Sequence, residues 1–230
     1  MSPGGPGSDT VLEIDTPRGT ARVTRHPASS PTHPAPRGLL LLGHGAGGGI
    51  GAPDLVAATG AATAAGFDVG LVEQPYRVAG RRAPAPAGHL DEAWTAVADA
   101  VRGDLPLVQG GRSSGARVAC RTAAATGAVA VLCLAFPLHP PGKPERTRQP
   151  ELDGAGVPVL VIQGRGDRFG VPGDGPGRRV VLLEGDHGLK KQHAALTGTV
   201  GTWLASLDLT PATLTPAAPA GPAAPGSPPA

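Results

Sequence analysis

Continuous apolar runs alternate along this chain with longer stretches of helical periodicity. The runs lack a polar face, which is typical of parallel strands buried on both sides. The predicted strands cover residues 38–42, 67–73, 105–109, 129–136, 157–162 and 179–184. The predicted helices cover residues 54–65, 90–101, 114–126 and 192–207. This alternation predicts an α/β fold, in which a mostly parallel central sheet carries helices on both faces.

The segment before the first of these strands has a different pattern. Residues 10–15 and 20–25 alternate between apolar and polar side chains and flank Pro17-Arg18-Gly19, which predicts a β-hairpin. A proline-rich stretch over residues 26–36 predicts an exposed loop. At the other end, the last helix is expected to bury Val200, Trp203 and Leu204.

The two ends of the chain differ in composition from the rest. Residues 1–9 are rich in Gly, Pro and Ser, and residues 210–230 are rich in Pro and Ala, so we expect both to be disordered tails. Residues 10–209 then form one domain, as expected for a chain of 230 residues.

Composition and charge argue against several classes of function. The net charge is only +2 and the basic residues are scattered, without the basic stripe and interleaved aromatic residues of a nucleic-acid-binding protein. The N-terminus lacks the pattern of a signal peptide, and no apolar run approaches the length of about 20 residues that spans a membrane, which predicts a cytoplasmic protein. Cys120 and Cys133 are expected to be buried free thiols, and the histidines show no metal-ligand spacing.

A candidate nucleophile follows the strand over residues 105–109. The sequence Gly111-Arg112-Ser113-Ser114-Gly115 has the G-x-S-x-G spacing of a nucleophile elbow, a strained turn from a strand to a helix that exposes a serine. The turn brings neighbouring segments close together, so the residues two positions before and after the serine must be small. Ser113 is therefore the expected nucleophile.

An acid and a histidine follow two later strands. Asp167 comes after the strand over residues 157–162, and His187 comes after the strand over residues 179–184. Because sites in open parallel sheets form beyond the carboxyl ends of the strands, we expect both side chains to meet Ser113. The order Ser, Asp, His is that of α/β-hydrolases. The competing acids and the competing histidine are Asp153, Asp174, Asp186 and His193.

The glycine-rich segment Gly43-His44-Gly45-Ala46 is expected to help stabilise an oxyanion. In such sites one backbone N–H comes from this loop and another from the residue after the nucleophile, which assigns the donors to Ala46 and Ser114. The candidate substrate-contacting side chains are His44, Arg112 and Leu138. For His44 the favoured alternative is a hydrogen bond that fixes the loop, and for Arg112 it is an ion pair with a buried acid such as Glu73.

Five segments together resemble a known family: LLLLGHGAGGG, QGGRSSGARVA, FPLHPPGKPE, QGRGDRFG and GDHGL. They are similar to the small α/β-hydrolases without a cap, and within these to the KANSL/Tex-like group, a neighbour of the dienelactone hydrolase-like enzymes. The resemblance extends over residues 11–207. It implies the α/β-hydrolase fold and the Ser, Asp, His triad, and it leaves the substrate open. The connection over residues 137–156 is too short for a helical cap domain, so we expect an open site.

These features predict a serine hydrolase that cleaves a small carboxylic ester or thioester without a cofactor or a metal. One alternative is an oxidoreductase, since Gly43 to Gly48 also fits the G-x-G-x-x-G pattern of a dinucleotide-binding loop, with Glu73 at the end of the next strand. The other is a non-catalytic interaction protein that binds partners through its proline-rich tails or its open cleft. The set of Ser113, Asp167 and His187 argues against both.

Overall fold

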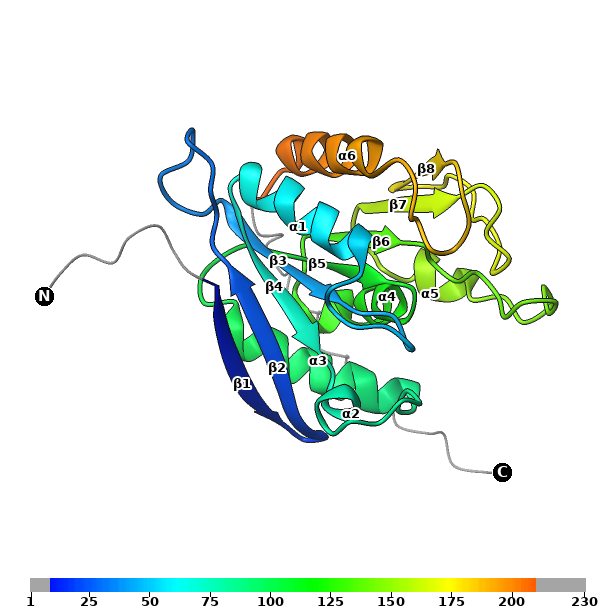
Figure 1. The fold of residues 1–230 in the computed structure, drawn as a ribbon, viewed down its shortest axis with the longest axis horizontal. Helices are drawn as coiled ribbons and strands as arrows, with labels where there is room; N and C mark the ends of the chain where they lie inside the picture. The colour runs from blue at the N-terminus through cyan, green and yellow to red at the C-terminus, as the bar shows by residue number, and fades with distance from the viewer. Residues whose placement is uncertain (1–8, 210–230) are drawn as a thin grey trace, which may run out of the picture.

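A computed structural model describes residues 9–209, in which the chain forms eight strands and six helices. The strands are β1 (Thr10–Thr16), β2 (Gly19–His26), β3 (Gly38–Gly43), β4 (Phe67–Glu73), β5 (Leu107–Arg112), β6 (Ala130–Leu134), β7 (Val159–Gly164) and β8 (Arg178–Leu183). They form one sheet in the order β1-β2-β4-β3-β5-β6-β7-β8 (Figure 1). β2 pairs antiparallel with β1 and β4, and the remaining pairs are parallel.

Helices cover both faces of this sheet. They are α1 (Pro53–Ala64), α2 (Pro75–Val78), α3 (Ala87–Val101), α4 (Ser114–Thr126), α5 (Gln149–Asp153) and α6 (His193–Ser206). α1 and α6 pack side by side on the upper face in Figure 1, while α3 and α4 pack against each other on the opposite face. Among residues 9–209, no helix is both long and apolar enough to cross a membrane.

Strands in the middle of the sheet are buried on both faces, which gives two hydrophobic cores. Along β3, Leu39 and Leu41 belong to the core under α3 and α4, whereas Leu40 and Leu42 belong to the core under α1 and α6. Since side chains of a strand point alternately to its two faces, an unbroken apolar run serves both cores. The two cysteines are free and buried in the first core, as predicted.

The predicted strands and long helices are all present close to their expected bounds. The expectation that β8 is buried on both faces is wrong, because β8 lies at the edge of the sheet and most of its side chains are partly exposed. Trp203 of α6 is likewise only partly buried, whereas Val200 and Leu204 are fully buried. The helices α2 and α5 are too short for a helical period to be visible in the sequence.

The connections at the carboxyl edge of the sheet leave it uncovered by a further domain. Residues 137–156, between β6 and β7, contain α5 as their one helix, so the absence of a cap domain is confirmed. The strand order also differs from the 3-2-1-4-5-6 order of the dinucleotide-binding fold. The two predicted tails, residues 1–9 and 210–230, lie outside the described residues except for Asp9.

Candidate active site

Ser113 stands at the turn between β5 and α4, near the middle of the sheet. Its backbone has a φ of 52° and a ψ of −107°, a conformation that residues other than glycine rarely adopt. In a nucleophile elbow such a turn places the serine at the top of the sheet, directly before the first turn of the helix. The strained turn expected from the motif is therefore present.

Close contact between this turn and β3 explains the two glycines of the motif. A Cβ atom added at Gly111 or at Gly115 would lie 2.4 Å from the carbonyl oxygen of Gly43. That oxygen belongs to the backbone of a central strand, so it cannot move aside. The G-x-S-x-G spacing is thus a consequence of how tightly β3 and the elbow pack.

The structure brings Ser113, His187 and Asp167 together. The Oγ atom of Ser113 lies 3.0 Å from Nε2 of His187, and Nδ1 of His187 lies 2.7 Å from Oδ2 of Asp167. When Nδ1 donates its proton to Asp167, Nε2 is the basic nitrogen that faces the serine hydroxyl. The three residues follow β5, β8 and β7 respectively. This is the arrangement of a nucleophile, a base and an acid that orients the base.

The carboxylate of Asp167 is buried and firmly held. Its Oδ1 accepts the N–H of Phe169 at 2.8 Å, while Nε2 of Gln163 donates to Oδ2 at 2.7 Å. Gln163 is the next-to-last residue of β7, and its Nε2 also lies within 3.1 Å of the carbonyl oxygens of Phe136 and Gly170. Sequence reasoning missed Gln163. A polar residue at the end of an otherwise apolar strand was the signal that could have revealed it.

The competing acids and the competing histidine are engaged elsewhere. Each forms an ion pair or hydrogen bond in its own loop or with a neighbouring one. The partners are Arg178 for Asp153, the Val180 N–H for Asp174, the Gly188 N–H for Asp186 and the Leu189 carbonyl oxygen for His193. Across residues 9–209, no group of three or more His, Cys, Asp or Glu side chains could hold a metal ion.

The glycine-rich loop after β3 passes directly beside Ser113. A Cβ atom added at Gly45 would lie 3.6 Å from the Cβ of Ser113. The hydroxyl of Tyr76 donates to the carbonyl oxygen of Ala46 at 3.1 Å, which ties this loop to α2. Within residues 9–209 neither the N–H of Ala46 nor that of Ser114 has a backbone acceptor, so both are free to donate to an oxyanion.

His44 holds the same loop in place. Its ring is buried, Nδ1 donates to the carbonyl oxygen of Gly45 at 2.8 Å, and Nε2 accepts the N–H of Gln74 at 3.2 Å. Burial lowers the pKa of His44, because the protonated ring cannot be solvated there. Both ring nitrogens are therefore occupied, and the geometry supports the loop-fixing alternative over a substrate contact.

Arg112 links three segments around the site. Its Nε lies 2.8 Å from Oδ2 of Asp54, and its Nη2 donates to the carbonyl oxygen of His187 at 2.9 Å. Asp54 lies in the first turn of α1 and is fully buried, and burial raises the pKa of its carboxyl group although the charge of Arg112 opposes this. The buried acid beside Arg112 is thus Asp54, whereas Glu73 lies near Arg22. No sequence pattern marks Asp54, because acids are common in the first turn of a helix.

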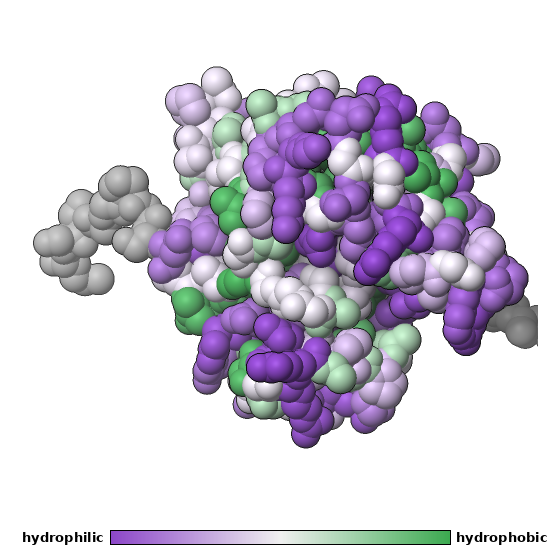
Figure 2. All heavy atoms as spheres, turned by 45° about the vertical axis from the view of Figure 1, so that its right-hand side comes forward, coloured by the Kyte–Doolittle hydropathy of each residue, from purple (hydrophilic) through white to green (hydrophobic). Residues whose placement is uncertain are grey.

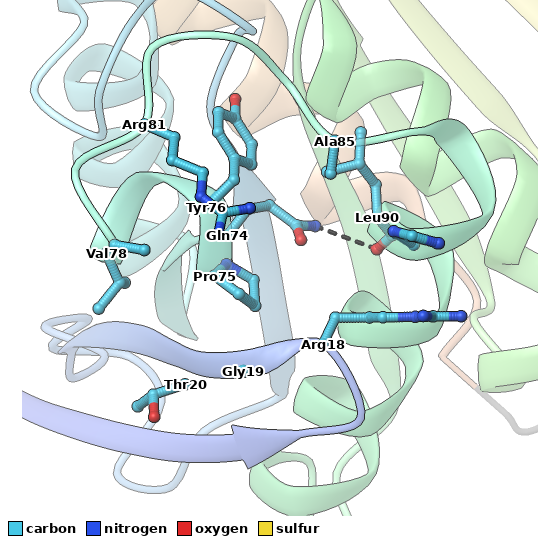
Figure 3. Close-up of a pocket in the computed structure, with 12 residues that line it drawn as sticks. Arg18, Gly19, Thr20, Gln74, Pro75, Tyr76, Val78, Arg81, Ala85 and Leu90 are labelled. Atoms are coloured by element: carbon cyan, nitrogen blue, oxygen red, sulfur yellow. Dashed lines mark hydrogen bonds between the residues drawn. The ribbon is translucent and has the colours of Figure 1, made fainter.

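A cavity of about 430 Å³, here the Tyr76 cavity, lies between the β1–β2 turn, α2 and the start of α3 (Figure 3). Gln74 points across it toward Leu90, whose carbonyl oxygen accepts its Nε2 at 3.2 Å. The Oε1 of Gln74 is buried without a hydrogen-bond partner in the described part of the chain. Gln74, Tyr76 and Leu90 also line a void of about 10 Å³ that reaches His44 and Ser114, so this cavity lies behind the glycine-rich loop after β3.

A second cavity of about 420 Å³, here the His187 cavity, lies on the β8 side of Ser113. Its walls are the loops after β7 and β8, and Arg112 at the end of β5 also lines it. Ser113 itself lines neither cavity. Leu138, in the connection after β6, is partly buried and lies next to Gly170 in the loop after β7, at the border of the site. Figure 2 turns this side of the molecule forward and shows that hydrophilic side chains cover most of it.

The fold and this site are those of an α/β-hydrolase. Residues 36–197 match the family model described as an alpha/beta hydrolase domain, and the chain belongs to that family. The matched segment contains the glycine-rich loop, the elbow, Asp167 and His187. Family membership excludes the oxidoreductase alternative, while the narrower resemblance to the KANSL/Tex-like group remains a prediction. None of the curated proteins matches the chain.

Solved structures with the same fold span nearly the whole domain. XC6422 from Xanthomonas campestris, described as an α/β serine hydrolase without a lid, is 21% identical with a TM-score of 0.66, covering 87% of this chain and 95% of its own. Est1E from Butyrivibrio proteoclasticus is 15% identical with a TM-score of 0.66, covering 84% and 97%. Dienelactone hydrolase from Anabaena variabilis is 16% identical with a TM-score of 0.65, covering 86% and 97%. At these identities the likeness shows the shared fold.

Proposed function

We propose that this protein is a serine hydrolase that cleaves a small carboxylic ester or thioester through an acyl-enzyme on Ser113. The observation that carries the proposal is the chain of contacts from Ser113 Oγ to His187 Nε2, and from His187 Nδ1 to Asp167 Oδ2, at 3.0 and 2.7 Å. Similar structures include a serine hydrolase without a lid, an esterase domain from Rhodothermus marinus, and Est1E with bound ferulic acid, which supports the same class of reaction.

In this mechanism Ser113 Oγ attacks the substrate carbonyl carbon while His187 Nε2 takes the hydroxyl proton. Asp167 keeps the imidazole in the tautomer with Nδ1 protonated and stabilises the imidazolium that forms. The N–H groups of Ala46 and Ser114 donate to the oxyanion. Each such donor typically contributes about 3 kcal/mol to transition-state stabilisation. His187 then protonates the leaving group, and water hydrolyses the acyl-enzyme by the same steps in reverse.

Acyl groups are expected to be short or extended, because no cap encloses the site. A buried methylene contributes about 0.8 kcal/mol, but an open groove buries little of a long chain. 4-Nitrophenyl acetate and butyrate should therefore be hydrolysed faster than the palmitate. A steep preference for palmitate would contradict the open site.

The test of the nucleophile is labelling with a fluorophosphonate probe, followed by mass spectrometry of the modified peptide. The label should be on Ser113. Ser113→Ala should abolish labelling and lower ester hydrolysis by several orders of magnitude, with little change in the thermal midpoint. Ser114→Ala is the matched control. This variant should still be labelled on Ser113, because the backbone N–H of residue 114 is unchanged. Absence of labelling in the folded wild-type protein would favour the non-catalytic alternative.

A further inference from the structure

We propose that the His187 cavity receives the leaving group of the substrate, and that this leaving group carries a negative charge recognised by Arg168 and Lys190. The inference rests on the proposed function, because it concerns the substrate of the same serine. It goes further by naming the charge of the alcohol, phenol or thiol that is released.

The chemistry of acylation places the leaving group beside His187. A bond forms between Ser113 Oγ and the carbonyl carbon, and the bond from that carbon to the leaving oxygen or sulfur breaks. The proton that His187 Nε2 took from Ser113 passes to the leaving atom. That atom must therefore lie within hydrogen-bond reach of Nε2. The cavity that His187 itself lines is the space beside that atom for the rest of the leaving group.

The charges around this cavity favour an anion. Arg168 and Lys190 are exposed residues of its wall, and neither forms a salt bridge within residues 9–209. The positive charge of Arg112 is matched by Asp54. The carboxylate lining the cavity is that of Asp186, and its Oδ1 already accepts the Gly188 N–H at 2.8 Å. The Gly188 N–H and the nearby charge of Lys190 both lower the pKa of Asp186, so this carboxylate offsets part of the charge of Lys190, and Arg168 remains without an acidic partner among the described residues. The lining therefore carries a net positive charge.

The cavity also offers an aromatic surface next to these charges. The ring of Phe169 lies 4.2 Å from the ring of His187, centroid to centroid. The guanidinium carbon of Arg168 lies 5.5 Å from the centre of the Phe169 ring. A flat leaving group that packs on Phe169 can therefore present an anionic end to Arg168. A guanidinium binds a carboxylate through two parallel hydrogen bonds, which suits this position.

A matched pair of acetyl esters tests the inference. 4-Acetoxybenzoate releases an anionic phenol, and methyl 4-acetoxybenzoate releases the neutral methyl ester of the same phenol. The quantity measured is the ratio of kcat/KM for the charged ester to kcat/KM for the neutral one. Taking this ratio cancels losses of active protein, because both esters share the acyl group and the enzyme preparation.

The variants are Arg168→Gln, Lys190→Gln and the double substitution. Each single change should lower the ratio about three- to fivefold and the double change about tenfold, as expected for partly exposed charge pairs. Raising the salt concentration should lower the wild-type ratio in the same direction. The matched controls are Arg165→Gln and Lys191→Gln, which remove a neighbouring exposed cation that does not line the cavity. Both controls should leave the ratio within about twofold of the wild-type value.

A second readout does not require turnover. 4-Hydroxybenzoate should slow fluorophosphonate labelling of Ser113 more than its methyl ester does, and the double variant should lose this difference. An unchanged ratio and unchanged protection in the double variant would overturn the inference while leaving the serine hydrolase intact. If Ser113 is not labelled and neither ester is hydrolysed, the proposed function fails, and the inference fails with it.

Discussion

The two sides of Ser113 are constructed differently. On the β8 side, the loops after β7 and β8 carry exposed charged residues, and hydrogen bonds among Asp167, Gln163 and His187 hold them together. On the β4 side, the buried side chains of His44 and Tyr76 hold the glycine-rich loop Gly43–Ala46, here the oxyanion loop. His44 bonds to the Gly45 carbonyl oxygen and to the N–H of Gln74 just after β4, and Tyr76 bonds to the Ala46 carbonyl oxygen.

This difference separates two tasks of a hydrolase. In the proposed mechanism, the β8 side contains the groups that move protons and face the leaving group, so the effect of replacing Arg168 or Lys190 should depend on the charge of the leaving group. In the same mechanism, the β4 side fixes the position of the backbone donors to the carbonyl oxygen of every ester. Substitutions there should therefore lower the rates for all substrates by a similar factor.

The largest effect is expected where both sides meet, at the contact between β3 and the elbow. Gly115→Ala places a Cβ atom 2.4 Å from the Gly43 carbonyl oxygen, and the backbone there cannot relax. We expect a loss of about 3 kcal/mol in unfolding free energy. For a domain of this size, that lowers the thermal midpoint by about 6–12 °C. Gly47→Ala is the control, since a Cβ at Gly47 meets no atom within 4 Å. Equal midpoints for the two variants would show that the close contact is absent.

On the β8 side, Arg112→Gln should lower kcat/KM about 100-fold. The guanidinium pairs with Asp54 and holds the His187 carbonyl oxygen, so its loss displaces the imidazole from Ser113, and a shift of about 1 Å costs about this much. The rate of fluorophosphonate labelling should fall in parallel, because it reports the same alignment with fluoride as the leaving group in place of an alcohol or phenol.

Three further variants separate positioning from a general loss of stability. Asp54→Asn should act in the same direction, and the double variant should be no worse than Arg112→Gln alone, since both changes break one interaction. Arg117→Gln removes an arginine that pairs with Glu151 instead, and it should keep its labelling rate. Additive losses in the double variant would contradict a shared role for Arg112 and Asp54.

The sequence predicts those parts of this site that follow from a strand period or a fixed motif spacing. Ser113, Asp167 and His187 each follow an apolar run, and buried parallel strands end at a common edge. Interaction partners that meet only through the tertiary fold, without a fixed spacing in the sequence, could not be predicted. Asp54 is near Arg112 only because α1 starts beside the elbow. Gln163 reaches Asp167 because a tight turn directly after β7 brings Asp167 back to the end of the strand. The partial exposure of β8 likewise depends on its place at the sheet edge.

On the β4 side, Tyr76→Phe should lower kcat/KM about fivefold, with little change in KM. The substitution keeps the ring and removes the hydroxyl that donates to the Ala46 carbonyl oxygen, a hydrogen bond with a net value of about 1 kcal/mol. The loss should be the same for 4-acetoxybenzoate and for its methyl ester. A loss confined to the charged ester would mean that Tyr76 contacts the leaving group, and the distinction between the two sides would be wrong.

The smallest effect is expected in the pH dependence of stability, through His44 on the β4 side. Burial lowers the pKa of His44 in the folded protein, whereas an unfolded histidine titrates near 6.5. Below about pH 6.5 the imidazole of His44 is protonated in the unfolded chain but stays neutral in the folded protein, so the free energy of unfolding falls as the pH falls.

The variant His44→Gln lacks this contribution to the pH dependence. Urea unfolding is measured at pH 7.5 and at pH 5.5. Between these two values the unfolding free energy of the wild-type protein should fall by up to about 1 kcal/mol more than that of the variant. The other histidines are present in both proteins, so their contributions cancel in this comparison. An equal loss in the two proteins would mean that His44 is protonated in the folded state, and with Nε2 then unable to accept the Gln74 N–H, the oxyanion loop would be held differently.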